Sequence, residues 1–147
     1  MLTVLISGFI LAGVFIPPLV INHQPRLAEF FYYLYSPLCH QRPDRCYLIL
    51  GQALAVCSRC LGIYSGFFLI SFFYPLFSQK FKHWVHSRPY LIVITALPMV
   101  LDVSAGLLKL WSSSLILKSA TGFIWSSCLP FYWFPALEEL NLPWRKQ

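Results

Sequence analysis

Residues 53–77 read ALAVCSRCLGIYSGFFLISFFYPLF, and this stretch decides the fold class. Its one charged residue is Arg59. The stretch is long enough to cross a hydrocarbon core about 30 Å thick, which takes about 20 residues of helix. Cys57 and Cys60 lie near its beginning. The sequence therefore predicts a transmembrane helix that carries a Cys-x-x-Cys motif at one membrane boundary.

The composition of the whole chain agrees with a membrane protein. Of its 147 residues, 58% are hydrophobic and 11% are charged, whereas soluble domains carry about 25% charged residues. The net charge of +6 comes from short segments between apolar runs, which favours contact with anionic lipid headgroups over nucleic acid. The length predicts a single membrane domain over residues 1–147.

Three further apolar runs are predicted to span the bilayer, at about residues 1–21, 90–110 and 115–137. The first run has no charged side chain and neither the basic n-region nor the small-residue cleavage site of a secretory signal. We expect a retained helix that bends or ends near Pro17 and Pro18. The predicted fold class is thus all-α, an integral membrane bundle of about four helices.

The longest connection, residues 22–52, lies between the first two spans. Its segment 27–35 is amphipathic and aromatic, which predicts a helix along the membrane interface.

Four spans place both chain termini on the same side as the connection 78–89. The lysines and arginines near that side are Lys80, Lys82, Arg88, Arg145 and Lys146. Those in the connections on the other side are Arg26, Arg42, Arg45 and Lys109. The positive-inside rule then favours cytoplasmic termini by a margin of one residue.

Charged residues inside the predicted spans converge on the half of the membrane that holds Cys57 and Cys60. Asp102 lies about eight residues from the end of its span, or roughly 12 Å deep at about 1.5 Å per residue. Lys118 lies in the first turn of the last span. Because ionisable residues inside membranes usually face a partner in the protein interior, Asp102 is expected to pair with Arg59 or Lys118. The alternative is that Lys118 reaches to the headgroups and Asp102 only joins two helices.

The cysteines form a candidate metal site. A Cys-x-x-Cys motif at a helix start places two sulfurs within reach of one ion, and the free backbone N–H groups there favour thiolates. Cys39 and His40 could complete a tetrahedral set with Cys57 and Cys60, or Cys46 could replace His40. Structural zinc uses such ligands, and iron is also compatible. Both Cys39 and His40 can bind only if the backbone there is irregular, and His40 could instead donate a hydrogen bond to a thiolate.

The same cysteines support a redox hypothesis. The pairs Cys39/Cys46 and Cys57/Cys60 in a four-helix membrane bundle resemble quinone-linked disulfide-forming enzymes such as vitamin K epoxide reductase, an analogy of arrangement alone. This reading requires that the cluster face an oxidising compartment.

A third hypothesis is an accessory subunit of a larger membrane complex, with the motif shaping only the fold. Buried cysteines can also be small hydrophobic residues. Whether the protein is an enzyme stays open.

Two motifs carry a resemblance to a known family. Cys-His-Gln-x-Pro-x-Arg runs from Cys39 to Arg45, and Cys-x-Arg-Cys-x-Gly-Ile-Tyr runs from Cys57 to Tyr64. The chain resembles an uncharacterised family of small multi-span bacterial and archaeal membrane proteins, which implies the cytoplasmic (inner) membrane of a prokaryote. The resemblance implies that these residues form one site: Cys39, His40, Arg45, Cys57, Arg59, Cys60 and Asp102. Cys46, Val103 and Lys118 depart from the family pattern.

Overall fold

The structure is a computed structural model, and it describes residues 2–108 and 113–141. Met1 and residues 109–110, at the ends of predicted spans, lie outside the described residues. So do Lys109, Arg145 and Lys146, which entered the charge count for orientation. The orientation of the chain in the membrane therefore stays a prediction.

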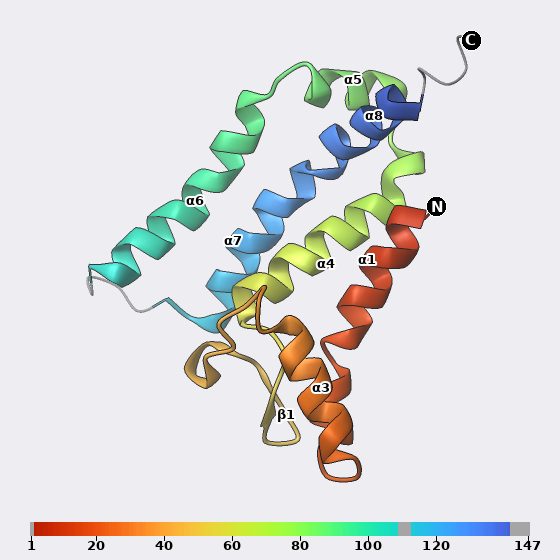
Figure 1. The fold of residues 1–147 in the computed structure, drawn as a ribbon. Helices are drawn as coiled ribbons and strands as arrows, with labels where there is room; N and C mark the ends of the chain where they lie inside the picture. The colour runs from red at the N-terminus through yellow and green to blue at the C-terminus, as the bar shows by residue number, and fades with distance from the viewer. Residues whose placement is uncertain (1, 109–112, 142–147) are drawn as a thin grey trace.

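The described chain is mostly helical (Figure 1). Its α-helices are α1 (Leu2–Gly13), α2 (Ile16–Val20), α3 (Pro25–Tyr35), α4 (Ser58–Phe73), α5 (Gln79–His86), α6 (Tyr90–Leu107), α7 (Leu115–Cys128) and α8 (Pro130–Asn141). Two short 3₁₀ helices are η1 (Pro43–Arg45) and η2 (Tyr74–Leu76). A small antiparallel hairpin pairs β1 (Leu48–Ile49) with β2 (Gln52–Ala53).

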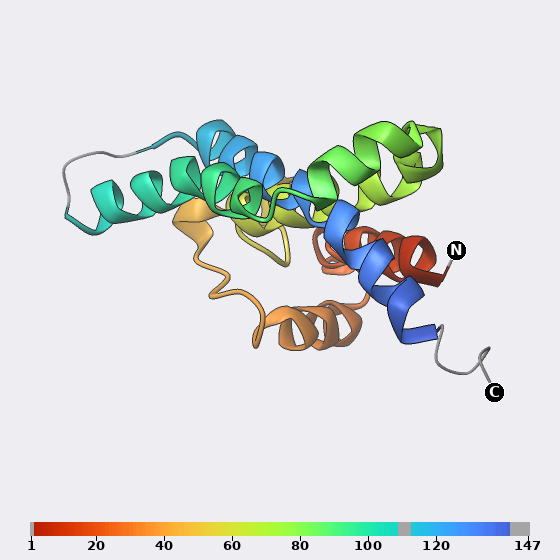
Figure 2. The ribbon, with the colours of Figure 1, turned by 90° about the horizontal axis from the view of Figure 1, so that it is seen from above.

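Four helices run side by side in the order α1, α4, α7, α6, and α3 lies to one side of them (Figures 1 and 2). The contact between α4 and α7 is the most extensive. Gly62 lies so close to α7 that a Cβ atom on it would overlap the carbonyl oxygen of Ser119. A Cβ on Gly122 of α7 would lie 2.5 Å from the carbonyl oxygen of Arg59. Gly62 and Gly66 therefore permit α4 and α7 to pack closely.

Two of the four predicted spans have the length and composition of membrane helices among the described residues. These are Ser58–Leu76, which combines α4 with η2, and Tyr90–Leu107, which is α6. The other two predicted spans are each divided into shorter helices, at residues 14–15 and at Leu129. The described residues therefore contain two helices that are long and apolar enough to cross a membrane.

The break in the first predicted span has a local cause. Pro17 and Pro18 have no N–H group to donate to the carbonyls one turn earlier, so α1 cannot continue into them, and they occupy the first turn of α2 instead. The helix α1 ends at Gly13, and the freed carbonyl of Val14 accepts a hydrogen bond from the backbone N–H of Ala55 at 3.4 Å. The bend expected near the two prolines thus joins the first helix to the segment that leads into α4.

The connection between α2 and α4 folds back onto the beginning of α4. As predicted, it contains an amphipathic helix, α3. The Tyr35 hydroxyl donates to the carbonyl of Ile10, and the Tyr32 hydroxyl donates to that of Ala53. A buried core forms there from Val14, Tyr35, Cys39, Leu54, Ala55 and Val56. This core brings the end of α3 to the beginning of α4.

Candidate metal centre

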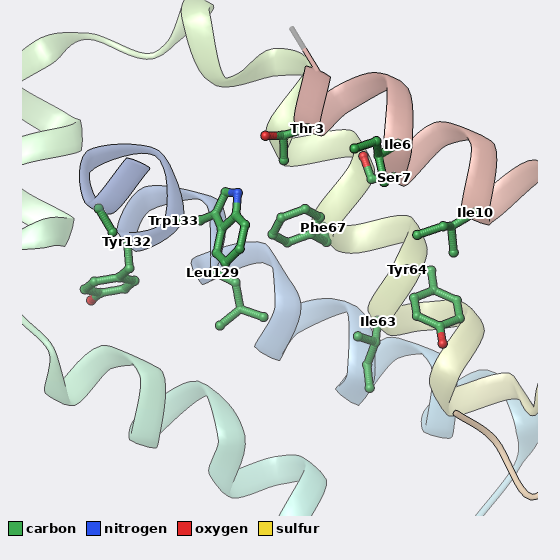
Figure 3. A pocket seen from close by; sticks show the side chains of 11 residues that line it. Thr3, Ile6, Ser7, Ile10, Ile63, Tyr64, Phe67, Leu129, Tyr132 and Trp133 are labelled. Atoms are coloured by element: carbon green, nitrogen blue, oxygen red, sulfur yellow. The ribbon is translucent and has the colours of Figure 1, made fainter. Parts of the chain in front are cut away.

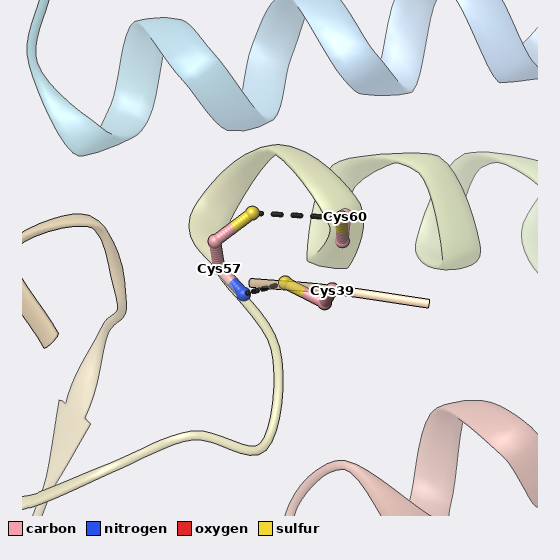
Figure 4. A group of neighbouring side chains, drawn as sticks. All are labelled: Cys39, Cys57 and Cys60. Atoms are coloured by element: carbon pink, nitrogen blue, oxygen red, sulfur yellow. Dashed lines mark hydrogen bonds between the residues drawn. The ribbon is translucent and has the colours of Figure 1, made fainter. Parts of the chain in front are cut away.

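Cys57 and Cys60 lie at the beginning of α4, as the Cys-x-x-Cys motif predicted. Cys57 is the residue before the first helical position and has an extended backbone, with φ −68° and ψ 160°. Its side chain therefore lies at the helix end, and Cys60 follows one turn later. The two Sγ atoms are 3.5 Å apart (Figure 4). A single ion can reach both sulfurs from this position.

Cys39 supplies a third sulfur from the connection after α3. Its backbone N–H donates to the carbonyl of Tyr35, and the residue is 5% exposed. The Sγ atom of Cys39 accepts a hydrogen bond from the backbone N–H of Cys57 at 3.1 Å (Figure 4). The sulfurs of Cys39, Cys57 and Cys60 all lie within 4.8 Å of one another. We call these three residues the sulfur cluster.

Gln41 holds the connection beside the sulfur cluster, a role that the sequence did not reveal. Its side-chain Nε2 donates to the carbonyls of Tyr32 at 2.7 Å and Ala55 at 2.8 Å. Its backbone is left-handed, with φ 48°, which is uncommon for a residue other than glycine. The side chain thus joins α3 to the segment before α4. The signal for this role was the position of Gln41 two residues after Cys39 in the first motif.

Hydrogen bonding within the sulfur cluster favours a thiolate. Side-chain hydrogen bonds with Cys39 and then with Cys60 lower the pKa of Cys57, against the opposing effect of burial. A thiolate is the form that binds metals and attacks disulfides. Cys57 is therefore the member of the cluster that we expect to be ionised first.

Cys46 lies apart from the sulfur cluster in the part of the chain that the structure describes. Its thiol donates a hydrogen bond to the carbonyl of Arg42 at 3.1 Å. Burial is the main cause that raises the pKa of Cys46 to about 11. Cys46 is thus a neutral thiol near pH 7 in the metal-free protein, and a neutral thiol is a poorer nucleophile than a thiolate.

His40 and Arg45 lie at the surface. His40 is exposed and is not among the three grouped ligand residues, although it directly follows Cys39. The side chain of Arg45 is also exposed, with its Nε 3.6 Å from Asp44 Oδ2. The structure therefore brings together three of the four predicted metal ligands, and the fourth place stays a prediction.

Asp102 of α6 forms an ion pair with Arg59 of α4, through Oδ2 and Nη2. The structure thus has the first of the two pairings that the sequence left open. The Asp102 side chain is 5% exposed and that of Arg59 is 21% exposed. Lys118 instead donates from Nζ to the carbonyl of Ser113 at 2.8 Å. Since Arg59 lies between Cys57 and Cys60 in the chain, this pair joins the helix end that carries the sulfurs to α6.

The spacing of the sulfurs fits a tetrahedral metal. A Zn–S bond of about 2.3 Å and tetrahedral angles place two ligand sulfurs about 3.8 Å apart. The Cys57–Cys60 distance of 3.5 Å and the 4.8 Å limit on all three pairs are close to this value. Small side-chain rotations would suffice to reach a common ion. Alternatively, two neighbouring thiols could be oxidised to a disulfide.

Comparison with known proteins places this site within a family. A family model described as "Predicted membrane protein (DUF2085)" matches residues 39–132, a range that begins at Cys39 and includes Asp102. An uncharacterized protein of Methanocaldococcus jannaschii, MJ1492, is 36% identical over 109 residues, which cover 74% of this chain and 69% of its own. An uncharacterized protein of Methanothermobacter thermautotrophicus is 30% identical over 88 residues, 58% of this chain and 74% of its own. No solved structure matches the chain.

Proposed function

The chain belongs to this family of predicted membrane proteins, and we propose that its sulfur cluster binds a metal ion at the membrane interface, with zinc as the preferred metal. The observation that supports this function best is the convergence of three sulfurs from two segments, with Cys39 eighteen residues before Cys57. Apolar packing alone would not require that three sulfurs share one point. Soft thiolate ligands select zinc or iron over hard cations.

His40 is the proposed fourth ligand. Adjacent residues on a regular helix or strand point apart, but Cys39 and His40 lie between helices, next to the left-handed Gln41. The proposal requires that the exposed His40 side chain turn toward the sulfur cluster when the metal binds. A set of three cysteines and one histidine is typical of closed structural zinc sites. Iron remains compatible with the same ligands.

The proposed role of the metal is to fix the connection between α2 and α4 to the membrane helices. Structural metal sites contribute their binding free energy to folding. Arg59 and Lys118 place positive charge on the same half of the molecule as the thiolates, and Asp102 holds Arg59 in place. Arg45, which the family resemblance assigns to the site, would contribute through long-range charge only, because it pairs with Asp44 at the surface.

The proposed membrane arrangement has four crossings in one domain. Two crossings are formed by α4 and α6. The third consists of α1 followed by α2, and the fourth consists of α7 followed by α8. The side-by-side order of α1, α4, α7 and α6 supports this arrangement (Figure 1). The site would then lie at one boundary of a prokaryotic inner membrane, with both termini on the opposite, cytoplasmic side.

Metal analysis of the protein purified in detergent without chelators tests the metal proposal. We expect about one zinc or iron per chain, lost in Cys57→Ser. Cys128→Ser is the matched control, since Cys128 lies at the end of α7 and outside the sulfur cluster, and it should keep the metal. Wild-type protein without stoichiometric metal, and unaffected by Cys57→Ser, would refute the proposal.

A thiol–disulfide oxidoreductase is the second candidate function, because the sulfurs of Cys57 and Cys60 lie 3.5 Å apart. Oxidation would join these sulfurs and pass two protons and two electrons to a quinone, which becomes a quinol. Of the two cysteines predicted to exchange with this pair, Cys39 is the proposed partner, because its sulfur lies within 4.8 Å of both, whereas Cys46 is outside this group. Alkylation of membranes denatured with a chelator under non-reducing conditions decides this, because the chelator removes any bound metal. A Cys57–Cys60 pair that stays protected supports the function, and two freely labelled thiols oppose it.

The third hypothesis, an accessory subunit, stays a prediction. Exposed apolar side chains on α6, such as Val93 and Leu101, would be covered equally well by lipid or by a partner subunit.

A further inference from the structure

A groove with a volume of about 610 Å³ lies between α1, α4 and α8 (Figure 3). Ile6 and Ile10 of α1 line one side, Tyr64 and Phe67 of α4 line its base, and Trp133 of α8 lines the other side. The volume is within the range of about 300–1,000 Å³ that is usual for small-molecule sites. The groove is therefore large enough for a ring with part of an apolar tail.

The groove continues the face of α4 that carries the cysteines. Cys57, Cys60, Tyr64 and Phe67 follow one another at intervals of three and four residues, which places them along one side of the helix. Tyr64 also packs against the buried core that contains Cys39. The end of the groove at Tyr64 thus lies about one helical turn from the sulfur cluster.

The lining selects for an uncharged ligand. None of the described residues that line the groove is charged. Aromatic rings come from two sides of the groove, Tyr64 and Phe67 from one helix and Trp133 from another (Figure 3). The polar side-chain atoms among the described lining residues are the hydroxyls of Thr3, Ser7, Tyr64 and Tyr132 and the indole N–H of Trp133. The Ser7 and Tyr132 hydroxyls already donate to backbone carbonyls, which leaves Thr3, Tyr64 and Trp133 as donors for a ligand. Flat neutral rings stack on aromatic side chains, and hydroxyls can donate to carbonyl oxygens on such a ring.

We propose that this groove binds a lipid-soluble quinone, with its ring near Tyr64 and its tail directed along α1. A phospholipid chain could fill the apolar part, but its charged headgroup has no ionic partner among the lining residues. The inference goes beyond the metal proposal, because quinone binding requires neither the metal nor oxidation of the thiols. If the oxidoreductase function holds, the bound quinone is the electron acceptor that it needs.

Titration with decylubiquinone tests the proposal by quenching of tryptophan fluorescence in detergent-purified protein. We expect saturable quenching that is largely lost in Trp133→Phe and kept in Trp84→Phe, whose ring lies outside the groove on α5. Ala136→Phe, which adds a ring to the groove lining, should raise the Kd about tenfold or more. Val93→Phe is the control, because Val93 lies on α6 and is 63% exposed.

Two results would overturn the proposal. The first is equal quenching in Ala136→Phe and Val93→Phe when both elute as folded protein in gel filtration. The second is full displacement of the quinone by an equimolar amount of a phosphatidylcholine. This result would mean that the groove binds only acyl chains. The Cys57→Ser variant separates the two proposals, since it should lose the metal and keep the same Kd for decylubiquinone.

Discussion

Arg59 and Asp102 form an ion pair between the first turn of α4 and the membrane-crossing helix α6. The Asp102 carboxylate is nearly inaccessible to solvent. Arg59 Nε and Asp102 Oδ1 are buried and have no further hydrogen-bond partner among the described residues. Arg59 is the direct ionic partner of Asp102, and Lys118 adds a second positive charge that acts on the same carboxylate. The Arg59–Asp102 pair fixes the end of α4 that carries Cys57 and Cys60.

Removing one member of this pair should destabilise the protein strongly. Breaking a buried ion pair by removing one partner costs about 3–5 kcal/mol, because the other charge stays buried and uncompensated. We expect Asp102→Ala to lower the thermal unfolding temperature clearly in detergent. The double variant Arg59→Met with Asp102→Leu should regain much of the loss, since it removes both charges.

Asp44→Ala is the matched control for Asp102→Ala. Asp44 forms ion pairs with Arg42 and Arg45 that are solvent-exposed, and such pairs contribute about 0–1 kcal/mol. Equal thermal stability of Asp102→Ala and Asp44→Ala would show that the buried pair has no structural role.

The contact between α4 and α7 should not tolerate a side chain at Gly62. A Cβ there would overlap the Ser119 carbonyl, which belongs to the backbone and cannot rotate away. Overpacking of this kind costs about 1–3 kcal/mol, so Gly62→Ala should lower the unfolding temperature. At Gly8 the nearest atom, 2.8 Å from an added Cβ, is at the end of the Phe68 ring. Gly8→Ala should therefore lower the unfolding temperature less than Gly62→Ala does. A larger decrease for Gly8→Ala would contradict the close contact described between α4 and α7.

Gln41 should control metal retention without being a ligand. Gln41→Leu leaves the carbonyls of Tyr32 and Ala55 without their side-chain donor, and each unsatisfied buried group costs about 1–3 kcal/mol. We expect faster loss of zinc to a chelator, measured with a colorimetric indicator. Arg42→Leu, a neighbouring exposed position, should release zinc at the wild-type rate. Equal release rates for Gln41→Leu and wild type would exclude the role proposed for Gln41.

The sequence predicted the membrane helices at α4 and α6 because their composition alone determines them. It also placed Cys39 with Cys57 and Cys60, because both motifs lie at the membrane boundary where the second predicted span begins. It could not resolve the choice between His40 and Cys46, because this choice depends on the backbone of the connection. The left-handed Gln41 is held by hydrogen bonds from its side chain to Tyr32 and Ala55, nine and fourteen residues away, which no local pattern shows.

Division of the last predicted span at Leu129 was not foreseen, whereas the first span was expected to bend or end near Pro17 and Pro18. Apolar composition continues through Pro17 and Pro18 and through Pro130, so hydropathy alone predicts one long helix in each case. The structure instead ends α1 at Gly13 and α7 at Cys128. In the first case the freed Val14 carbonyl finds a partner in Ala55, forty-one residues later, which a sequence pattern does not reveal.

The thiols of metal-free protein should differ in their dependence on pH. Because the pKa of Cys57 is lowered, its thiolate persists as the pH falls from 9 to 7, where an ordinary cysteine with a pKa of about 8.5 becomes protonated. Its alkylation rate should therefore change little over this range. The pKa of Cys46 is raised to about 11, so its labelling should be slow below that pH and become fast in denaturant.

Peptide mapping by mass spectrometry after timed iodoacetamide labelling measures both rates in one sample. A cysteine-containing model peptide is the control, and its rate should fall about tenfold per pH unit below about 8.5. The assignment of the thiolate to Cys57 is wrong if Cys57 follows the model peptide.

X-ray absorption spectroscopy at the absorption edge of the bound metal tests the central claim most directly, because it identifies the atoms around the ion. For zinc, three cysteines and His40 predict three sulfur neighbours at about 2.3 Å and one nitrogen at about 2.0 Å. Cys39→Ser should reduce the sulfur neighbours to two. A shell of oxygen and nitrogen atoms without sulfur would contradict metal binding by Cys39, Cys57 and Cys60.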